Sequence, residues 1–144
     1  MQTNRKISLV VPVYNSRECV QPLVHRVQEC LEGLEYELIL INDCSPDETW
    51  EEIKKAVKSN NRVIGINLRK NYGQDNAIMA GFSRVSGDYV VIMDDDLQHD
   101  PGDINKLVLE LEKGDFDVCF ANFKTRKHRK WKILEVGSME KWQK

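Results

Sequence analysis

Apolar runs of the extended type alternate with amphipathic segments of the helical type, and this alternation restricts the fold more than any other feature. The runs expected to form strands are residues 7–14, 37–42, 62–68, 89–93 and 117–121. The segments between them with helical spacing of apolar residues are 18–31, 46–58, 74–85 and 100–113. Nearly continuous apolar strands separated by helices are typical of a parallel sheet that is covered on both faces. The sequence therefore predicts an α/β fold with a doubly wound, mostly parallel sheet and right-handed crossovers.

Two helix starts carry capping signals. Ser45 is followed three residues later by Glu48, which is the pattern of a capping box, and Pro46 suits the first helical position. We therefore expect Ser45 to cap a helix that starts at Pro46. Asp100 is expected to cap the helix that continues through Lys113.

The distribution of charge separates a core from a basic end. A length of 144 residues fits a single domain. Residues 1–123 contain 13 Lys and Arg against 21 Asp and Glu, whereas residues 124–144 contain 8 against 2. We assign residues 1–123 to the core and 124–144 to a basic carboxyl-terminal segment. The cations within 124–132 suit an anionic lipid surface or a phosphate, and a solvated end of the chain is the alternative.

The cysteines and the hydropathy pattern exclude several classes of protein. Four cysteines lie far apart without a C-x-x-C pair, so neither a disulfide framework nor a zinc site is indicated, and a reducing cytoplasm fits best. No run approaches the ~18 apolar residues that a membrane-spanning helix needs. The amino-terminal end also lacks the apolar region of a signal peptide.

Three consecutive carboxylates follow the apolar run 89–93. Clustered acids repel one another and are costly to desolvate unless a cation lies among them. Alternation along an extended backbone would send Asp94, Asp96 and Gln98 to one side and Asp95 to the other. Such oxygen donors suit Mg²⁺ or Mn²⁺, and Mg²⁺ is usually held by one or two carboxylates together with substrate phosphates. The pattern predicts a site for a metal diphosphate, with a solvated acidic turn as the alternative.

Polar and aromatic residues follow the other expected strands. Tyr14 offers a ring to cover the face of a base, Asp43 a carboxylate for a base N–H, and Arg69 and Lys70 two cations for a diphosphate. Carboxyl ends of parallel strands meet at one edge of a sheet, where open α/β folds bind ligands. Taken singly, each of these residues is also compatible with a capping loop or with surface charge.

These segments resemble the amino-terminal part of glycosyltransferase family 2, which has the GT-A fold. Within the family, the chain is similar to the polyprenyl-phosphate sugar transferases, the branch of dolichol-phosphate mannosyltransferase and bactoprenol glucosyltransferases. The D-x-D-L-Q pattern with the acidic, Pro-containing helix start after it is the most branch-specific feature. The matching segments are Val10-Val11-Pro12-Val13-Tyr14-Asn15, Asn42-Asp43-Cys44-Ser45-Pro46-Asp47, Lys70-Asn71-Tyr72-Gly73-Gln74, Ala80-Gly81 and Met93-Asp94-Asp95-Asp96-Leu97-Gln98-His99.

The resemblance implies an inverting enzyme that takes a hexose from a nucleotide-diphosphate sugar, with UDP-glucose favoured as donor. It implies that Asp94 and Asp96 are catalytic through a bound metal. It assigns five residues to nucleotide binding: Pro12, Tyr14, Asp43, Lys70 and Asp95. It assigns three residues to the binding of Mn²⁺ or Mg²⁺: Asp94, Asp96 and Gln98. Asp95 is expected to point away from the metal, so two alternatives to nucleotide binding stay open for it: stabilising the fold or contacting the acceptor.

The resemblance also implies an acceptor and a place in the cell. The acceptor is a polyprenyl phosphate at the cytoplasmic face of the plasma membrane, so an anionic membrane surface is an expected partner. Where the family commonly has an Arg after the fifth strand, this chain offers Lys124 or Arg126 for the acceptor phosphate. We expect no nucleic-acid partner, and the sequence leaves the oligomeric state open.

Several departures from the family pattern keep alternatives open. Cys44 stands where Gly is common, and Pro46 and Glu48 replace the usual Thr and Gly. Family members extend well beyond residue 144 and often carry membrane spans, so the chain is expected to be a truncated GT-A core. A transferase with a sugar hydroxyl acceptor in polysaccharide synthesis, or a nucleotide-binding fragment without turnover, are the alternatives. A nicotinamide-dependent enzyme is disfavoured because no glycine occurs in 14–17.

Overall fold

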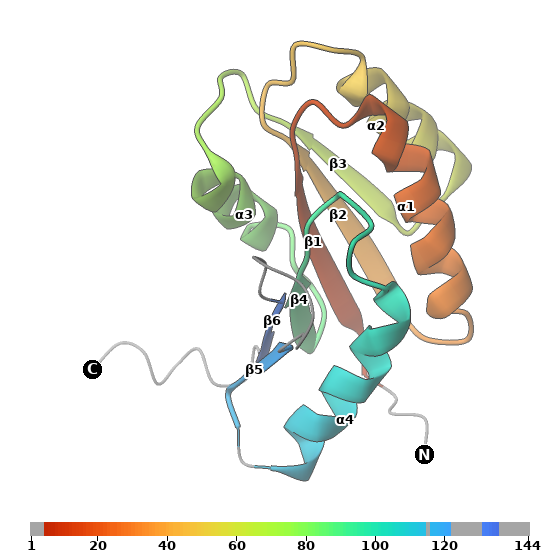
Figure 1. Cartoon of the computed structure of the whole chain (residues 1–144), viewed down its shortest axis with the longest axis vertical. Helices are drawn as coiled ribbons and strands as arrows, with labels where there is room; N and C mark the ends of the chain where they lie inside the picture. Colours follow the sequence, from red (N-terminus) through yellow and green to blue (C-terminus); the bar gives the residue numbers. More distant parts are fainter. Residues whose placement is uncertain (1–4, 115, 122–130, 136–144) are drawn as a thin grey trace.

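The computed structural model describes residues 5–114, 116–121 and 131–135, which form one sheet with helices packed against it (Figure 1). The sheet has six strands in the order β3-β2-β1-β4-β6-β5. The strands are β1 (Ile7–Val13), β2 (Tyr36–Asn42), β3 (Val63–Asn67), β4 (Tyr89–Ile92), β5 (Val118–Ala121) and β6 (Trp131–Glu135). Strands β1 to β4 pair in parallel, and β6 pairs antiparallel with both β4 and β5. The predicted mostly parallel α/β sheet is confirmed.

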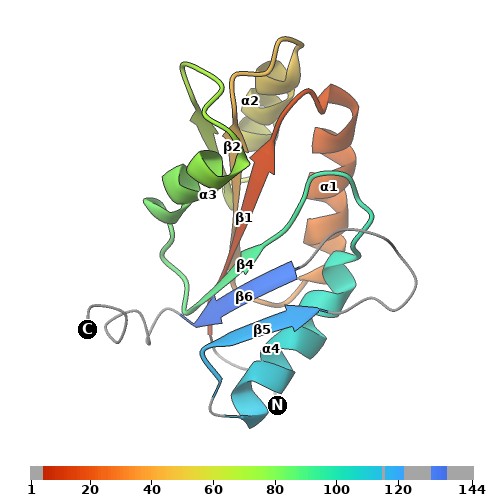
Figure 2. The ribbon, with the colours of Figure 1, turned by 60° about the vertical axis from the view of Figure 1, so that its left-hand side comes forward.

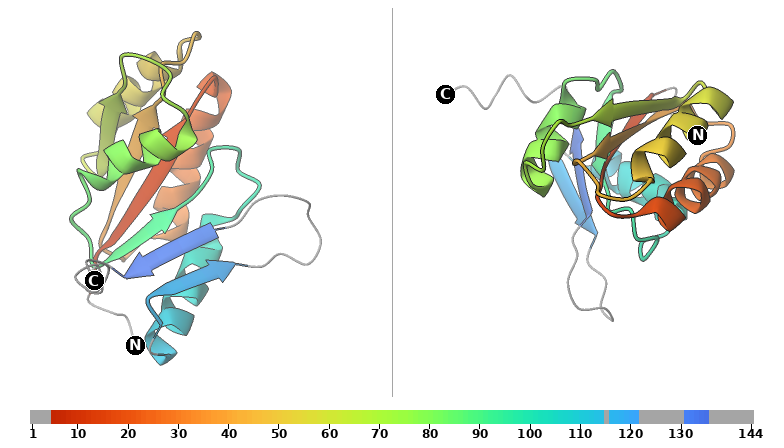
Figure 3. Two further views of the ribbon diagram at one scale, coloured as in Figure 1. Left: turned by 90° about the vertical axis from the view of Figure 1, so that its left-hand side faces the viewer. Right: turned by 90° about the horizontal axis from the view of Figure 1, so that it is seen from above.

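Helices cover both faces of the sheet, as Figures 2 and 3 show from two further directions. Helices α1 (Arg17–Cys30), α2 (Thr49–Ser59) and α4 (Ile104–Lys113) lie on one face, and α3 (Gln74–Phe82) lies on the other. A short 3₁₀ helix, η1 (Pro101–Asp103), leads into α4. All four predicted helices end within three residues of the expected positions, and α1, α2 and α3 also begin within three residues of them.

Alternation of side chains along the buried strands divides the core into two layers. Leu9 and Val11 of β1 belong to the larger cluster, which packs under α1, α2 and α4. Val10, between them, belongs to a smaller cluster with Ala77 of α3. Because both faces of β1 are buried, its sequence is continuously apolar rather than alternating.

Helix α3 approaches the sheet closely at Gly81. A Cβ atom there would lie 2.6 Å from Val10 Cγ1 and 2.8 Å from Ile41 Cδ1, which is closer than real Cβ contacts. Only glycine leaves room for the helix at this distance. The amino-terminal end of α3 is thereby fixed next to the carboxyl ends of the strands.

A buried polar network joins β1, β2 and the turn before β4 near the amino-terminal ends of these strands. Glu37, 6% exposed, accepts hydrogen bonds from the hydroxyl of Ser8 at 2.6 Å and from the backbone N–H and hydroxyl of Ser86, each at 2.7 Å. The Lys6 ammonium lies 2.8 Å from Glu37 Oε2, the oxygen that also accepts from the Ser86 hydroxyl. Burial acts to raise the pKa of Glu37, but these partners outweigh burial and lower the pKa to about 2.

Two features differ from the sequence prediction. Strand β6 was not expected, and it lies inside the sheet although its residues fall in the basic segment assigned to 124–144. The expected capping box at Ser45 is wrong: α2 begins at Thr49, whose N–H donates to Asp47 Oδ1 at 3.0 Å. The hydroxyl of Ser45 bonds Asn42 instead, because the chain is still turning out of β2 at this point.

The described helices are short. None of those in 5–114, 116–121 or 131–135 is long and apolar enough to cross a bilayer.

Candidate functional site

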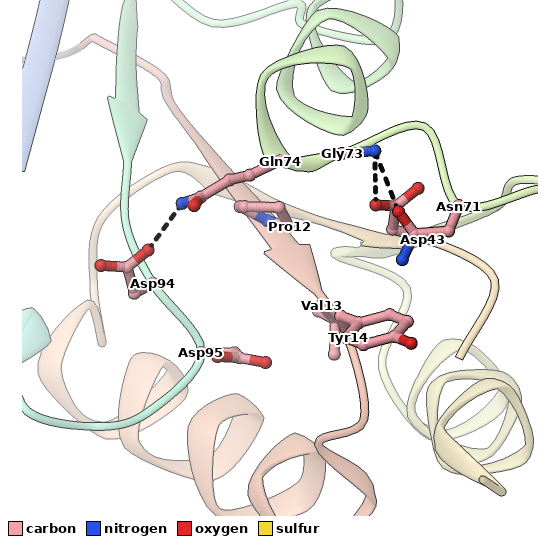
Figure 4. A pocket seen from close by; sticks show the side chains of 9 residues that line it. All are labelled: Pro12, Val13, Tyr14, Asp43, Asn71, Gly73, Gln74, Asp94 and Asp95. Atoms are coloured by element: carbon pink, nitrogen blue, oxygen red, sulfur yellow. Dashed lines mark hydrogen bonds between the residues drawn. The ribbon is translucent and has the colours of Figure 1, made fainter. Parts of the chain in front are cut away.

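The order of the strands creates a crevice between β1 and β4. The chain runs from β1 to β2 and β3 on one side, then returns to place β4 on the other side of β1. Open α/β sheets bind ligands outside the carboxyl ends of the strands at such a reversal. A pocket of about 300 Å³ lies there (Figure 4). Its lining comes from the ends of β1, β2 and β4 and the start of α3: Pro12, Val13, Tyr14, Asp43, Asn71, Gly73, Gln74, Asp94 and Asp95.

Tyr14 lines this pocket just past the end of β1. Its side chain is 50% exposed, so a planar ligand has access to the ring. The next residue, Asn15, has a φ of 51°, and its N–H donates to Ser45 Oγ at 3.0 Å. This left-handed turn directs the chain from β1 into α1 and leaves Tyr14 at the rim.

Asp43 holds the loop that precedes α3. The residue is 4% exposed, and its two carboxylate oxygens accept from the backbone N–H groups of Tyr72 at 2.8 Å and Gly73 at 3.0 Å. Each carboxylate oxygen can accept more than one hydrogen bond. Asp43 therefore organises the pocket wall in this structure and retains acceptor capacity for a ligand N–H.

Gln74, the first residue of α3, reaches across the pocket to the acid triplet. Its side-chain amide Nε2 donates to Asp94 Oδ1 at 3.0 Å (Figure 4). Gln74 was not predicted as a site residue, because the contact joins residues that are far apart in the sequence. Asn71, whose side-chain oxygen accepts from Gly73 N at 3.2 Å, was also missed as a pocket residue.

Asp95 points away from Asp94 in Figure 4. Burial raises the pKa of its carboxyl group, and hydrogen bonding from the Ser16 side chain counteracts this only in part. Burial also raises the pKa of the Cys19 thiol, with the charges of Asp95 and Asp96 adding to the effect. These interactions place Asp95 beside the start of α1, although it also lines the pocket.

The backbone that carries the triplet is bent rather than extended. Strand β4 ends at Ile92, Leu97 has a φ of 58°, and Asp96 Oδ1 accepts from the Gln98 N–H at 3.1 Å. The strict strand alternation expected for 94–98 is therefore wrong, because a turn replaces the strand. Farther along, Arg26 of α1 forms two hydrogen bonds to Asp100, at 3.2 and 2.9 Å, and fixes the exit of this turn.

The residues present suit a hard divalent cation. The carboxylates of Asp94 and Asp96 and the side-chain carbonyl of Gln98 supply oxygen ligands. Mn²⁺ and Mg²⁺ prefer oxygen ligands of this kind. Within the described parts of the chain, no group of three or more His, Cys, Asp and Glu side chains is assembled for a metal. Two carboxylates completed by substrate phosphates remain consistent with this arrangement.

The predicted cations are not among the pocket-lining residues. Lys70 is exposed on the loop that leads to Asn71, next to the pocket rather than in its wall. Lys124 and Arg126 lie outside the described residues. Of the predicted nucleotide residues, Pro12, Tyr14, Asp43 and Asp95 share the pocket with Asp94.

The chain matches a known family over most of its length. The model for "Glycosyl transferase family 2" matches residues 8–141. This range covers all of the described strands except Ile7, the first residue of β1.

Three solved structures share the fold. The mannosyltransferase PcManGT from Pyrobaculum calidifontis, in complex with GDP-Man and Mn²⁺, is 15% identical, with a TM-score of 0.79 over 96% of this chain and 47% of its own. S. aureus TarS 1–349 is 17% identical, with a TM-score of 0.74 over 94% of this chain and 48% of its own. Glucosyl-3-phosphoglycerate synthase from Mycobacterium tuberculosis, in complex with Mn²⁺, UDP and glucosyl-3-phosphoglycerate, is 24% identical, with a TM-score of 0.62 over 77% of this chain and 41% of its own. The likeness confirms the GT-A fold, and this chain spans about half the length of these proteins.

Proposed function

The chain belongs to glycosyl transferase family 2, and from this premise we propose that it binds a UDP-sugar with a divalent cation and transfers a hexose, with glucose favoured, to a polyprenyl phosphate. The observation that carries the proposal is the pocket itself. It brings together an exposed aromatic ring that follows β1, a carboxylate that follows β2 and two acids that follow β4. The ring suits the face of a base, the carboxylate suits a base N–H, and the acids suit a metal diphosphate.

The base of the nucleotide lies against Pro12 and Tyr14 in this proposal. A half-exposed Tyr ring contributes a stacking surface without losing much conformational freedom. Asp43 accepts a hydrogen bond from the base N–H with a lone pair left by the two backbone amides that it already holds. Lys70, exposed beside the pocket, contributes positive charge toward the diphosphate.

The diphosphate lies toward the acid triplet. Asp94, Asp96 and Gln98 would hold Mn²⁺ or Mg²⁺, and the bound cation would stabilise the nucleoside-diphosphate leaving group as a Lewis acid. PcManGT and the M. tuberculosis synthase, whose structures contain Mn²⁺ with GDP-Man or UDP, support this choice. The half-buried Asp95 lies at the β1 side of the same pocket, where it orients the turn or contacts the bound nucleotide.

The polyprenyl-phosphate acceptor in this proposal is compatible with inverting transfer that uses no protein base. A phosphate monoester has a second pKa near ~6 and is largely ionised at neutral pH, so it attacks the anomeric carbon without a protein base. Lys124 and Arg126 would neutralise this acceptor, and the cations within 124–132 would keep the site close to an anionic membrane at the cytoplasmic face. A sugar hydroxyl acceptor would require a general base in addition.

The donor assignment predicts metal-dependent nucleotide binding. We expect UDP to bind more tightly with Mn²⁺ than with EDTA, because a cation held by the triplet would neutralise the charge of the diphosphate. We also expect a moderate preference for UDP over GDP. Isothermal titration of the chain with each nucleotide, with and without Mn²⁺, measures both effects. UDP affinity that is the same in Mn²⁺ and EDTA contradicts the metal site.

The acceptor assignment predicts transfer at a membrane. Vesicles of anionic lipid that contain a polyprenyl phosphate are incubated with labelled UDP-glucose and the protein, then sedimented. We expect the protein to sediment at low salt, and the label to enter a mild-acid-labile lipid fraction. A variant with Ser at Arg126, Lys127, Arg129 and Lys130 should sediment less, whereas equal sedimentation contradicts the membrane surface. Label in polysaccharide alone favours a sugar hydroxyl acceptor, and nucleotide binding without transfer favours a binding fragment.

A further inference from the structure

Gln74 contacts the acid triplet from the opposite wall of the pocket. Its amide Nε2 lies 3.0 Å from Asp94 Oδ1, although the two residues come from α3 and from the end of β4. Gln74 is exposed. A hydrogen bond between an amide and a carboxylate that are both open to solvent contributes little net stability to a fold, because water competes for both groups. The contact is therefore poorly explained by stability alone.

The backbone beneath Gln74 is held in place from the other end of the pocket. Gly73 has a φ of 88°, which favours glycine, and its N–H donates to Asp43 Oδ2 at 3.0 Å and to Asn71 Oδ1 at 3.2 Å. Its carbonyl accepts from the Ala77 N–H at 3.0 Å and begins α3. The close packing at Gly81 fixes the remainder of this helix on the sheet. Gln74 thus projects from a firmly positioned backbone.

The chemistry of the contact suits support of a metal ligand. Asp94 Oδ1 accepts the amide N–H, and because a carboxylate has about four lone-pair positions, this single hydrogen bond does not compete with binding of a cation. Unlike Lys or Arg, a neutral amide orients the carboxylate without neutralising the charge that attracts the metal. Hydrogen bonds to metal-ligating carboxylates commonly change metal affinity by 10–100-fold.

We propose that Gln74 is a positioning residue that orients Asp94 to receive the divalent cation. This inference rests on the proposed function, because it takes Asp94 as a metal ligand. Its effect is confined to the metal end of the pocket, since Gln74 makes no hydrogen bond to Tyr14 or Asp43 in this structure.

The experiment compares Gln74→Leu and Gln74→Asn with the wild type. Leu keeps most of the volume and removes the amide, whereas Asn keeps the amide on a side chain that is one methylene shorter. Met79→Gln is the matched control, because Met79 is 62% exposed on the same helix. Mn²⁺ binding is measured by electron paramagnetic resonance of the free ion, UDP binding by calorimetry with Mn²⁺ and with EDTA, and folding by thermal melting.

We expect about a tenfold or larger increase in the Mn²⁺ dissociation constant for both Gln74 variants. Their UDP affinity in EDTA and their melting temperatures should equal those of the wild type and of Met79→Gln. Unchanged Mn²⁺ affinity overturns the role of Gln74 alone. Equal losses of UDP affinity in EDTA and in Mn²⁺ also overturn it, because they indicate a structural effect. Wild-type UDP binding that does not respond to Mn²⁺ instead overturns the proposed function.

Discussion

Asp96→Asn is expected to remove most of the Mn²⁺-dependent gain in UDP affinity and to leave the fold intact. The substitution replaces a carboxylate by an amide in the proposed donor set, so the metal loses a charged ligand. The apo protein should not be destabilised, because one of three neighbouring negative charges disappears. Calorimetry in Mn²⁺ should show UDP affinity reduced about tenfold or more, whereas the affinity in EDTA should not change.

Asp117→Asn is the matched control for this experiment. Asp117 is an exposed acid just before β5, away from the residues that line the pocket. The Asp117→Asn variant should bind UDP and Mn²⁺ as the wild type does. If Asp96→Asn retains the full response to Mn²⁺, Asp96 is not a metal ligand.

Glu37→Gln is expected to lower the free energy of unfolding at neutral pH by about 2–4 kcal/mol, as measured by urea denaturation. The variant keeps the size of the side chain but leaves Lys6 without its charged partner. It also presents amide hydrogens where the wild type accepts from Ser8 and Ser86. The loss arises at the amino-terminal edge of the strands, so it should not alter the pocket directly.

The stability of the wild type should also depend on pH through Glu37. Its pKa is lowered in the folded protein from the ordinary 4.5 to about 2, so the folded state favours the charged form. This contribution is fully present above about pH 4.5 and is lost as the pH falls toward 2. Glu37→Gln should lack this part of the pH dependence, whereas the exposed Glu35→Gln should retain it. Equal acid profiles for the wild type and Glu37→Gln would contradict this account.

The sequence predicted β1 to β5 well, because each is a short apolar run next to a clear helical pattern, whereas β6 lies in the basic segment and was missed. It could not say which side chains face which helices. Val10 and Val11 look alike in the sequence, and only the tertiary packing separates their two core layers. The start of α2 was placed too early, since Ser45 and Asp47 offer competing local hydrogen bonds and Asp47 accepts from Thr49.

The candidate site was predicted in part. Convergence of strand ends correctly brought Tyr14, Asp43 and Asp94 to one pocket, because parallel topology alone dictates it. Gln74 was missed because its contact depends on how closely α3 approaches the sheet, which no local pattern encodes. The bend around Leu97 was missed because a left-handed residue other than glycine has little signature in sequence.

The insertion of β6 between β4 and β5 has a consequence for biosynthesis. During translation, β4 leaves the ribosome well before residues 131–135, so one of its hydrogen-bonding edges initially lacks its neighbour. The unpaired backbone edge of an apolar strand is prone to pair with other chains. The strand that ends at the acid triplet is therefore among the last parts of the sheet to be sealed. In a nascent chain, this edge of β4 stays open until β6 has been synthesised.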